Sequence, residues 1–261
     1  MRITGRDNAR IKEIHKLITS GRARRERGLF VVEGVRICTD ALRSRIGIET
    51  LVYSDSAAQR YPEQLELLRA ACEAELSVPN DLFDKISDTK SPQGVLCVCK
   101  TPRLRLPIEQ IVQGGKYLAL ESLSDPANLG TIARTAEALG IDGLILSSGS
   151  CDPYSPKALR AGMGSLLRIP LVVADDFIAL IEALQQKGLR AYAAVPARDA
   201  VAVTKLPLCD GGIVMIGNEG NGLSEEAKAV AQRVTIPMAG RAESLNAAAA
   251  AAIMMWEMCR A

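Results

Sequence analysis

Three separated stretches in the second half of the chain combine glycines with polar side chains next to apolar runs. Turns of this kind follow the strands of parallel α/β sheets, where such sheets hold their ligands. We therefore expect the three stretches to form one ligand site. They are Asn128 and Gly130 with Arg134, then Gly217-Asn218-Glu219-Gly220-Asn221-Gly222, then Ile236 to Gly240 followed by Glu243-Ser244-Leu245-Asn246.

The middle stretch lacks the Gly-Lys-Ser/Thr ending of a triphosphate-binding loop, and it is not Gly-x-Gly-x-x-Gly. Glycines have no Cβ and tolerate unusual backbone angles, so such a loop brings its N–H and C=O groups close to a flat, polar ligand. Adenine or ribose fits that description better than a triphosphate. Glu219 adds a carboxylate, whose alternative role is to cap the helix that begins near Ser224.

Composition and length limit the kind of protein that carries this site. The chain has 261 residues, of which 48% are hydrophobic and 24% charged, as in folded proteins. The longest apolar run, 245–258, is too short for a bilayer, and the basic N-terminus lacks an apolar core. We expect a cytoplasmic protein without a membrane segment.

Metal and histidine chemistry are disfavoured. The seven cysteines lack zinc-site spacing, so most of them are expected to be reduced, buried hydrophobic residues, and no metal is expected. The single histidine, His15, lies far in sequence from the three stretches, which argues against a hydrolase with a histidine base.

A connector rich in proline and arginine, 102–107, predicts a division of the chain into domains 1–105 and 106–261. The first domain reads as a small α/β unit. Its expected helices are 11–18, 36–42, 62–75 and 81–86, and its expected strands are 30–32, 51–53 and 94–100.

The second domain alternates strands and helices, which predicts a mostly parallel sheet with right-handed crossovers. Small side chains at 247–252 indicate a last helix that packs closely on another backbone, with Trp256 at the core or at a dimer face. The expected strands are 117–120, 144–147, 171–173, 191–195, 212–216 and 234–236, and the expected helices are 129–139, 156–161, 177–187, 225–230 and 245–258.

The net charge is only +2, but basic residues cluster in the first 27 positions. Clustered arginines neutralise phosphates and bind them through the N–H donors of their planar guanidinium groups. The alternative is that these residues form a solvated helix face without a nucleic-acid partner. The densest part precedes an apolar strand and is expected to be an RNA-binding loop. Its predicted RNA contacts are Arg22, Arg24, Arg25 and Arg27.

The three stretches, in this order, resemble the three motifs of the SpoU (TrmH-type) RNA ribose methyltransferases of the SPOUT superfamily. The resemblance covers residues 113–261. Residues 1–100 resemble more loosely the ribosomal-protein-like RNA-binding domain that precedes many members, through the sequence Phe30-Val31-Val32-Glu33-Gly34.

This resemblance implies a C-terminal trefoil knot that binds S-adenosylmethionine, and a homodimer in which the neighbouring subunit completes each site. The implied reaction methylates a ribose 2′-hydroxyl of RNA, most simply ribosomal RNA. The implied cofactor residues are Gly217, Asn218, Gly220, Ile236, Met238 and Leu245. The implied catalytic residues are Arg134, Asn128, Ser244, Asn246 and Glu219.

Methyl transfer needs an aligned oxygen, carbon and sulfur and removal of the hydroxyl proton, whereas the neutral thioether leaves without an acid. A guanidinium pKa above about 12 conflicts with a base. We therefore expect Arg134 to polarise the hydroxyl and to hold phosphate.

Other interpretations remain open. Asn128, Ser244 or Asn246 could merely cap helices, and Arg134 could pair with Glu137 on a solvated face. The joint order and spacing of the motifs favour the site. Two alternative functions are a non-catalytic RNA-binding or ribosome-assembly protein with the same fold, and the same methyltransferase acting on transfer RNA.

Overall fold

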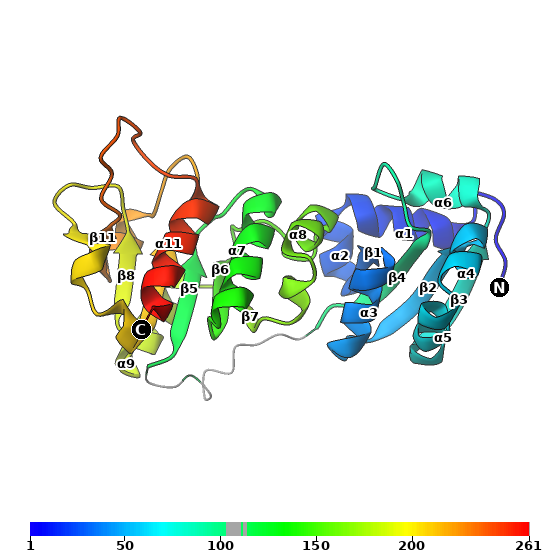
Figure 1. Cartoon of the computed structure of the whole chain (residues 1–261), viewed down its shortest axis with the longest axis horizontal. Coiled ribbons are helices and arrows are strands. Elements are labelled where there is room, and N and C mark those ends of the chain that lie inside the picture. Colours follow the sequence, from blue (N-terminus) through cyan, green and yellow to red (C-terminus); the bar gives the residue numbers. More distant parts are fainter. Residues whose placement is uncertain (103–110, 112–113, 261) are drawn as a thin grey trace. The chain divides into compact units, whose positions relative to one another are not determined.

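The computed structural model describes residues 1–102, 111 and 114–260, which form two compact units (Figure 1). The first unit contains the described residues up to 102 together with Tyr154–Leu167. The second contains the described residues from 111 to 153 and from 168 to 260. The predicted division at residue 105, and most of the connector, lie outside the described residues.

The first unit is built on a four-stranded sheet in the order β1-β4-β2-β3. The β1–β4 and β2–β4 pairs are antiparallel, and the β2–β3 pair is parallel. The strands are β1 (Leu29–Glu33), β2 (Ile48–Ser54), β3 (Cys72–Val78) and β4 (Val95–Lys100). The helices are α1 (Ala9–Thr19), α2 (Gly21–Arg27), α3 (Val35–Arg43), α4 (Asp55–Arg60), α5 (Pro62–Ala71), α6 (Asn80–Ile86) and α8 (Pro156–Gly162).

Helix α1 confirms the spacing argument, because Ile11, Ile14, Leu17 and Ile18 are all buried in the core of this unit. The expected helix 62–75 is wrong in its last part. Helix α5 ends at Ala71, and the chain continues as strand β3 beside β2. The pairing of β3 buries Leu76 and Val78 completely, and this tertiary burial outweighs the helix propensity of the residues before them.

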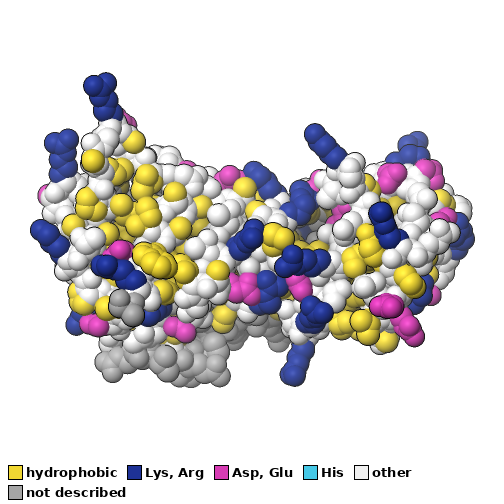
Figure 2. Space-filling model, viewed as in Figure 1, with side chains coloured by type: hydrophobic (Ala, Val, Ile, Leu, Met, Phe, Trp, Pro, Cys, Tyr) yellow, Lys and Arg dark blue, Asp and Glu magenta, His cyan; other side chains and the backbone are white. Residues whose placement is uncertain are grey.

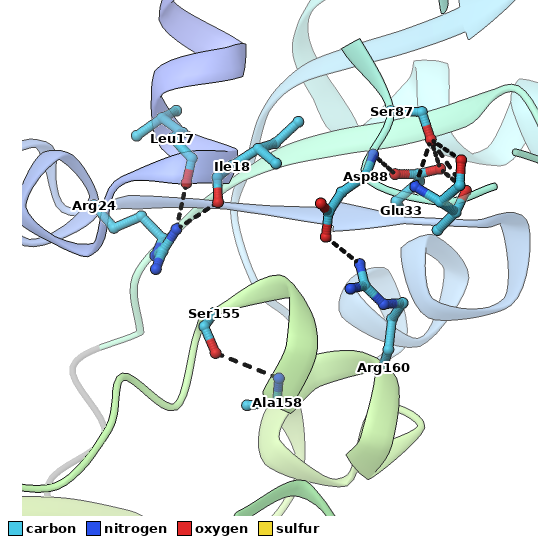
Figure 3. Close-up of polar contacts among 10 residues, drawn as sticks. Leu17, Ile18, Arg24, Glu33, Ser87, Asp88, Ser155, Ala158 and Arg160 are labelled. Atoms are coloured by element: carbon cyan, nitrogen blue, oxygen red, sulfur yellow. Dashed lines mark hydrogen bonds and ion pairs between the residues drawn. The ribbon is translucent and has the colours of Figure 1, made fainter. Parts of the chain in front are cut away.

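The arginine-rich segment is helix α2, so the predicted loop is wrong. Ser20 caps its start and Gly28, with φ 63°, ends it in the left-handed region. Arg24 is buried and donates from Nη1 to the carbonyl oxygens of Leu17 at 2.6 Å and Ile18 at 3.0 Å (Figure 3). Its guanidinium therefore satisfies carbonyl groups at the C-terminal end of α1. The burial of Arg24 conflicts with its predicted contact with RNA.

The other three predicted RNA contacts are exposed. Arg22 pairs with Glu26 at 2.6 Å and Arg27 pairs with Glu13 at 2.9 Å. Ion pairs this exposed contribute at most about 1 kcal/mol each, so the arginines can exchange their glutamate partners for another anion. Arg22, Arg25 and Arg27 remain predictions for RNA contact.

Helix α8 was expected within the run of the second domain, yet it packs in the first unit. The Tyr154 ring lies 4.7 Å from the Phe30 ring between centroids, and Arg160 pairs with Asp88 at 2.8 Å (Figure 3). The neighbouring Glu33 carboxylate accepts hydrogen bonds from Ser87 and Thr89. The loop before β4 is thereby held to the end of β1.

The second unit contains a seven-stranded sheet in the order β7-β6-β5-β10-β8-β11-β9, and every pair in it is parallel, as predicted. The strands are β5 (Lys116–Leu120), β6 (Gly143–Ser147), β7 (Leu171–Ala174), β8 (Ala191–Ala194), β9 (Val201–Ala202), β10 (Gly212–Ile216) and β11 (Gln232–Thr235). The helices are α7 (Pro126–Leu139), α9 (Phe177–Gln186), α10 (Glu225–Ala229) and α11 (Ala247–Cys259).

Helices α7 and α11 lie side by side on one face of this sheet (Figure 1). Ala247, Ala248 and Ala251 are buried, which confirms that the small residues face a packed neighbour. Trp256 is 58% exposed, so the prediction that it lies in the core is wrong and its place at a dimer face stays a prediction. Within the described ranges, no helix has the length and hydropathy needed to cross a bilayer.

We predict that Arg24→Met lowers the free energy of unfolding by about 1–3 kcal/mol, because the carbonyl groups at the end of α1 lose a charged donor. The matched control is Arg25→Met on the exposed side of α2, which changes this quantity by less than about 0.5 kcal/mol. Urea unfolding followed by circular dichroism measures both. Equal effects of the two substitutions would show that Arg24 has no structural role.

Candidate functional site

The three polar stretches meet at the carboxyl edge of the parallel sheet. One follows β5, the second follows β10 beside it, and the third follows β11 and leads into α11. Strands that run in the same direction deliver their following loops to the same edge. The sheet order therefore explains why stretches about ninety and one hundred and twenty residues apart become neighbours.

Two hydrogen bonds join the three stretches into one chain of contacts. The Nδ2 of Asn246 donates to the Oδ1 of Asn128 at 3.1 Å, and the Nδ2 of Asn128 donates to the Oε1 of Glu219 at 2.9 Å. Asn128 is thus the link between the other two stretches. These contacts confirm that the motifs converge in space.

The capping interpretation fails for Asn128 and holds for Asn246. Helix α7 begins at Pro126, so Asn128 lies inside its first turn, and the cap is Asp125, whose Oδ1 accepts from the Ala127 N–H at 3.0 Å. Asn246 caps α11 by accepting from the N–H groups of its second and third residues. Its amide nitrogen remains available for Asn128, so Asn246 serves both roles.

Glu219 is held by donors from the start of α7. Its Oε2 accepts from the backbone N–H of Ser124 at 3.0 Å and from the Ser124 hydroxyl at 2.7 Å. Its Oε1 accepts from the Asp125 N–H at 3.1 Å, in addition to Asn128. The alternative in which Glu219 caps the helix after Ser224 is therefore wrong, because it stabilises the start of α7 instead.

The hydrogen bonds also fix the charge of Glu219. Burial would raise the pKa of this carboxyl, but donation by Asn128 and by the backbone and hydroxyl of Ser124 outweighs it and lowers the pKa to about 2. Glu219 is therefore ionised at neutral pH. A carboxylate with four donors and so low a pKa is a poor proton acceptor and a good anchor.

The glycine loop closes on itself. Asn218 and Gly222 exchange backbone hydrogen bonds of 3.0 and 2.9 Å, and the Asn218 Oδ1 accepts from the N–H groups of Gly220 and Asn221. A Cβ on Gly217 would lie 2.1 Å from the carbonyl carbon of Gly222. The glycine at 217 is thus required by the close approach of the loop to its own backbone, and not only by room for a ligand.

A cavity of about 460 Å³ opens between the second and third stretches. Glu219 and Ser244 line it together with apolar side chains such as Val195 and Met254. The six predicted cofactor residues all line it as well: Gly217, Asn218, Gly220, Ile236, Met238 and Leu245. Asn128 and Asn246 do not line the cavity. Asn246 contacts Asn128, and Asn128 contacts Glu219, which does line it.

Arg134 is exposed on α7 and does not line this cavity. The alternative pairing with Glu137 is wrong, because Glu137 pairs with Arg168. Within the described residues no hydrogen bond or ion pair engages the Arg134 guanidinium. It is therefore available to an external anion.

The sequence interpretation missed the residues that support the site from strand β5. Glu121, Ser122, Ser124 and Asp125 all lie in the loop between β5 and α7. The available signal was an acidic residue directly after an apolar strand and an Asp-Pro pair at a helix start. The loop joins β5 to the first motif, and its acidic and serine residues hold the other motifs.

Cys151 also lies near this loop, and its N–H donates to the Leu123 carbonyl oxygen. Burial, followed by the charges of Glu219 and Asp125, raises the pKa of the thiol to about 12. Cys151 is therefore protonated at neutral pH and is not a nucleophile. No group of three His, Cys, Asp or Glu side chains suited to a metal ion occurs in the described part of the chain.

Comparison with known families assigns both units. Residues 115–256 match the model of the SpoU rRNA Methylase family, which is more than half of the chain. The chain belongs to the SpoU family. Residues 8–97 match the MRM3-like substrate binding domain, so the family pairing of a substrate-binding unit with a SpoU unit is present here.

Curated SpoU relatives extend over nearly the whole chain. A 23S rRNA (guanosine(2553)-2′-O)-methyltransferase of Bacillus subtilis is 29% identical over 96% of this chain and 96% of its own length. A 23S rRNA (uridine(2479)-2′-O)-methyltransferase of Streptomyces viridochromogenes is 31% identical over 99% of this chain and 92% of its own length.

Two solved structures of methyltransferases resemble this chain over nearly its whole length. The AdoMet-bound rRNA methyltransferase of Sinorhizobium meliloti has a TM-score of 0.88 and 32% identity, covering 99% of this chain and 97% of that one. The SpoU methyltransferase AviRb of Streptomyces viridochromogenes in complex with AdoMet has a TM-score of 0.86 and 29% identity, covering 97% of each chain.

We predict a pH-dependent contribution of Glu219 to stability. Its pKa falls from an ordinary 4.5 to about 2 on folding, so the contribution is complete above pH 4.5 and disappears as the pH falls toward 2. The difference in unfolding free energy between the unaltered protein and Glu219→Gln should therefore shrink between pH 5 and pH 3 in urea titrations. Glu182→Gln, an exposed control on α9, should show no such trend. A difference that stays constant over this range would contradict the assignment.

Proposed function

We propose that this protein transfers a methyl group from S-adenosylmethionine (AdoMet) to a ribose 2′-hydroxyl of ribosomal RNA. The observation that carries the proposal is the contact chain from Asn246 through Asn128 to Glu219, which ends in the wall of the cavity. The named activities of the SpoU relatives support the reaction, and AdoMet in their structures supports the cofactor.

The cavity fits AdoMet in size and chemistry. A volume of about 460 Å³ lies within the ordinary range of small-molecule sites. The loop 217–222 and the segment around Ile236 and Leu245 offer backbone groups to adenine and ribose, and Met238 offers an apolar wall. We infer that these segments, with Asn218 and Gly220, hold a bent cofactor within a C-terminal trefoil knot, in a methyltransferase domain 106–261.

The bound cofactor would supply an electrophilic methyl group on a positively charged sulfur. The chain must then align the hydroxyl oxygen with that methyl group, so that the O–C bond would form as the C–S bond breaks, and the hydroxyl proton would pass to solvent water. Arg134 has no partner of its own among the described residues, so its planar fork can bind the adjacent phosphate and polarise the hydroxyl.

The remaining polar residues position these groups. Glu219, ionised and saturated with donors, holds Asn128 rather than accepting the substrate proton. Ser244 lines the cavity and can orient the cofactor or the ribose. Asn246 fixes Asn128 from the other side and starts α11.

We infer a homodimer in which the neighbouring subunit completes each site. Arg233 lines the cavity but is paired with Asp199 at 2.9 Å, and Arg134 does not line the cavity of its own chain, so in this proposal the Arg134 at each cavity comes from a second subunit. Hydrophobic side chains gather over α11 (Figure 2), where Ile253 and Trp256, one turn apart, are 37% and 58% exposed. An exposed apolar stripe of this kind indicates a protein interface.

The dimer predicts that Trp256→Glu shifts the protein from dimer to monomer in sedimentation velocity, because the substitution places a charge in an apolar interface. The control is Leu67→Glu on α5 of the first unit, which is 57% exposed and should not change the sedimentation coefficient. A monomeric unaltered protein at micromolar concentration would contradict the proposal.

We propose that domain 1–105, with a ribosomal-protein-like fold, selects the RNA through exposed arginines of α2, namely Arg22, Arg25 and Arg27. The match to a substrate-binding domain and the positive charge of this helix support that role. Ribosomal RNA is favoured over transfer RNA by the named activities of the full-length relatives. The cytoplasm, where ribosomal RNA is modified in bacteria such as these relatives, is the proposed location.

The test of the function is methylation of ribosomal RNA from cells that lack this gene, with radiolabelled AdoMet and single turnovers. We predict that the unaltered protein methylates one ribose and that Arg134→Lys slows the step at least about a hundredfold, because the lost fork stabilises developing charge. Arg190→Lys, before β8 at the opposite edge of the sheet, is the matched control and should react normally.

Two results would contradict this account. Near-normal rates with Arg134→Lys across pH 6–9 would remove the need for a planar fork. No methylation of any RNA, together with no AdoMet binding in calorimetry, would favour the non-catalytic alternative.

A further inference from the structure

Both ends of the glycine loop are held by two adjacent residues that no motif includes. Glu121 and Ser122 follow strand β5, and the backbone N–H of Glu121 donates to the Ile216 carbonyl oxygen at 2.9 Å. This bond extends the β5–β10 ladder up to the point where the loop 217–222 begins. The two residues therefore lie directly beside the loop.

Glu121 holds the far end of the loop. Its Oε2 accepts from the Ser224 N–H at 2.8 Å, and its Oε1 accepts from the Ser224 hydroxyl at 2.6 Å. The Ser224 Oγ already accepts from the Ala227 N–H at 3.1 Å as the cap of α10. Its hydroxyl proton is thus directed to Glu121, and one half-buried carboxylate satisfies two donors.

Ser122 holds the near end of the loop. Its φ of 52° lies in the left-handed region, which costs a non-glycine residue roughly 1 kcal/mol, and its N–H donates to the buried Ser147 hydroxyl at 2.8 Å. In this conformation its carbonyl oxygen accepts from the Asn218 Nδ2 at 2.7 Å. The same Asn218 side chain organises the loop through Gly220 and Asn221.

We propose that Glu121 is a positioning residue that sets the conformation of the loop 217–224 for AdoMet binding. The inference rests on the proposed function, since it names how that cofactor loop is held. Glu121 does not line the cavity, so it acts through Ser224 and through the β5 end that carries Ser122. Its loss should affect cofactor affinity more than the chemical step.

A carboxylate is needed at this position because the Ser224 N–H and the Ser224 hydroxyl both donate hydrogen bonds to it. Replacement of Glu121 by glutamine keeps one acceptor oxygen and turns an NH₂ group toward a second donor. Either the Ser224 N–H or its hydroxyl proton then loses its acceptor, and the contact that remains no longer involves a charged group. The hold on the loop end is weakened while the size of the side chain is unchanged.

The experiment uses the full-length protein with AdoMet as the probe in isothermal titration calorimetry and in steady-state methylation. We expect Glu121→Gln to weaken AdoMet binding about tenfold and to raise KM for AdoMet equally, with kcat changed less than about twofold. Glu182→Gln is the matched control, since it neutralises an exposed carboxylate on α9 and should leave both parameters unchanged. The melting temperature of each variant is recorded in parallel.

Ser224→Ala tests the same contact from the other side and is the milder substitution if Glu121→Gln fails to fold. If Glu121 acts through Ser224, the double variant should bind AdoMet no more than about twofold more weakly than either single variant. Independent, multiplying effects would contradict the proposal.

Two further outcomes are decisive. AdoMet affinity of Glu121→Gln within twofold of the unaltered protein, or a fall in kcat with unchanged KM, would overturn the positioning role. Failure of the unaltered protein to bind AdoMet would overturn the proposed function, and this inference with it.

Discussion

The contact of Asn128 with Glu219 on one side and Asn246 on the other is the interaction on which the site depends. Each of these residues belongs to a different one of the three stretches, and each stretch has a separate reason to occupy its position. Glu219 is fixed by donors from the start of α7, and Asn246 is fixed as the cap of α11. Asn128 can bridge them because α7 and α11 pack side by side.

The parallel sheet makes that bridge possible, and the loop after β5 makes it rigid. Strands β5 and β10 are neighbours in register, so their loops leave the sheet together. Glu121 and Ser122 then tie the β10 loop at both of its ends, while Ser124 takes the Glu219 carboxylate. The loop 217–222, which forms one wall of the cavity, is thus fixed by hydrogen bonds. Glu219 is already ionised at neutral pH, so its four hydrogen bonds form without a change in its protonation.

Much of this could be predicted from the sequence, because the strands are short apolar runs and the glycine and asparagine motifs stand directly after them. The periodicity of α1 predicted its buried face, and the alternation of strands and helices predicted the parallel sheet of the second unit. Strand β3 could not be predicted in the same way, since its burial comes from pairing with β2 and not from local propensity. Arg24 has the residue type of a phosphate contact, and only tertiary packing shows that it closes a helix end.

The sequence predicted which stretches come together at the candidate site, but not the geometry of their contacts. The motifs named the residues that line the cavity, but Gly217 is needed for loop closure, and Glu219 serves the start of α7 instead of the helix after it. Arg134 lies outside the cavity of its own chain. Its position depends on the direction of an exposed side chain, which the spacing of the motifs in the sequence does not determine.

A crystal structure of the protein with AdoMet tests the central claim most directly. We predict electron density for the adenosine between the loop 217–222 and the segment 236–245, with the Asn246–Asn128–Glu219 contacts unchanged. Cofactor bound in another cavity, or an Asn128 amide that turns away from Glu219 when the cofactor binds, would contradict the account.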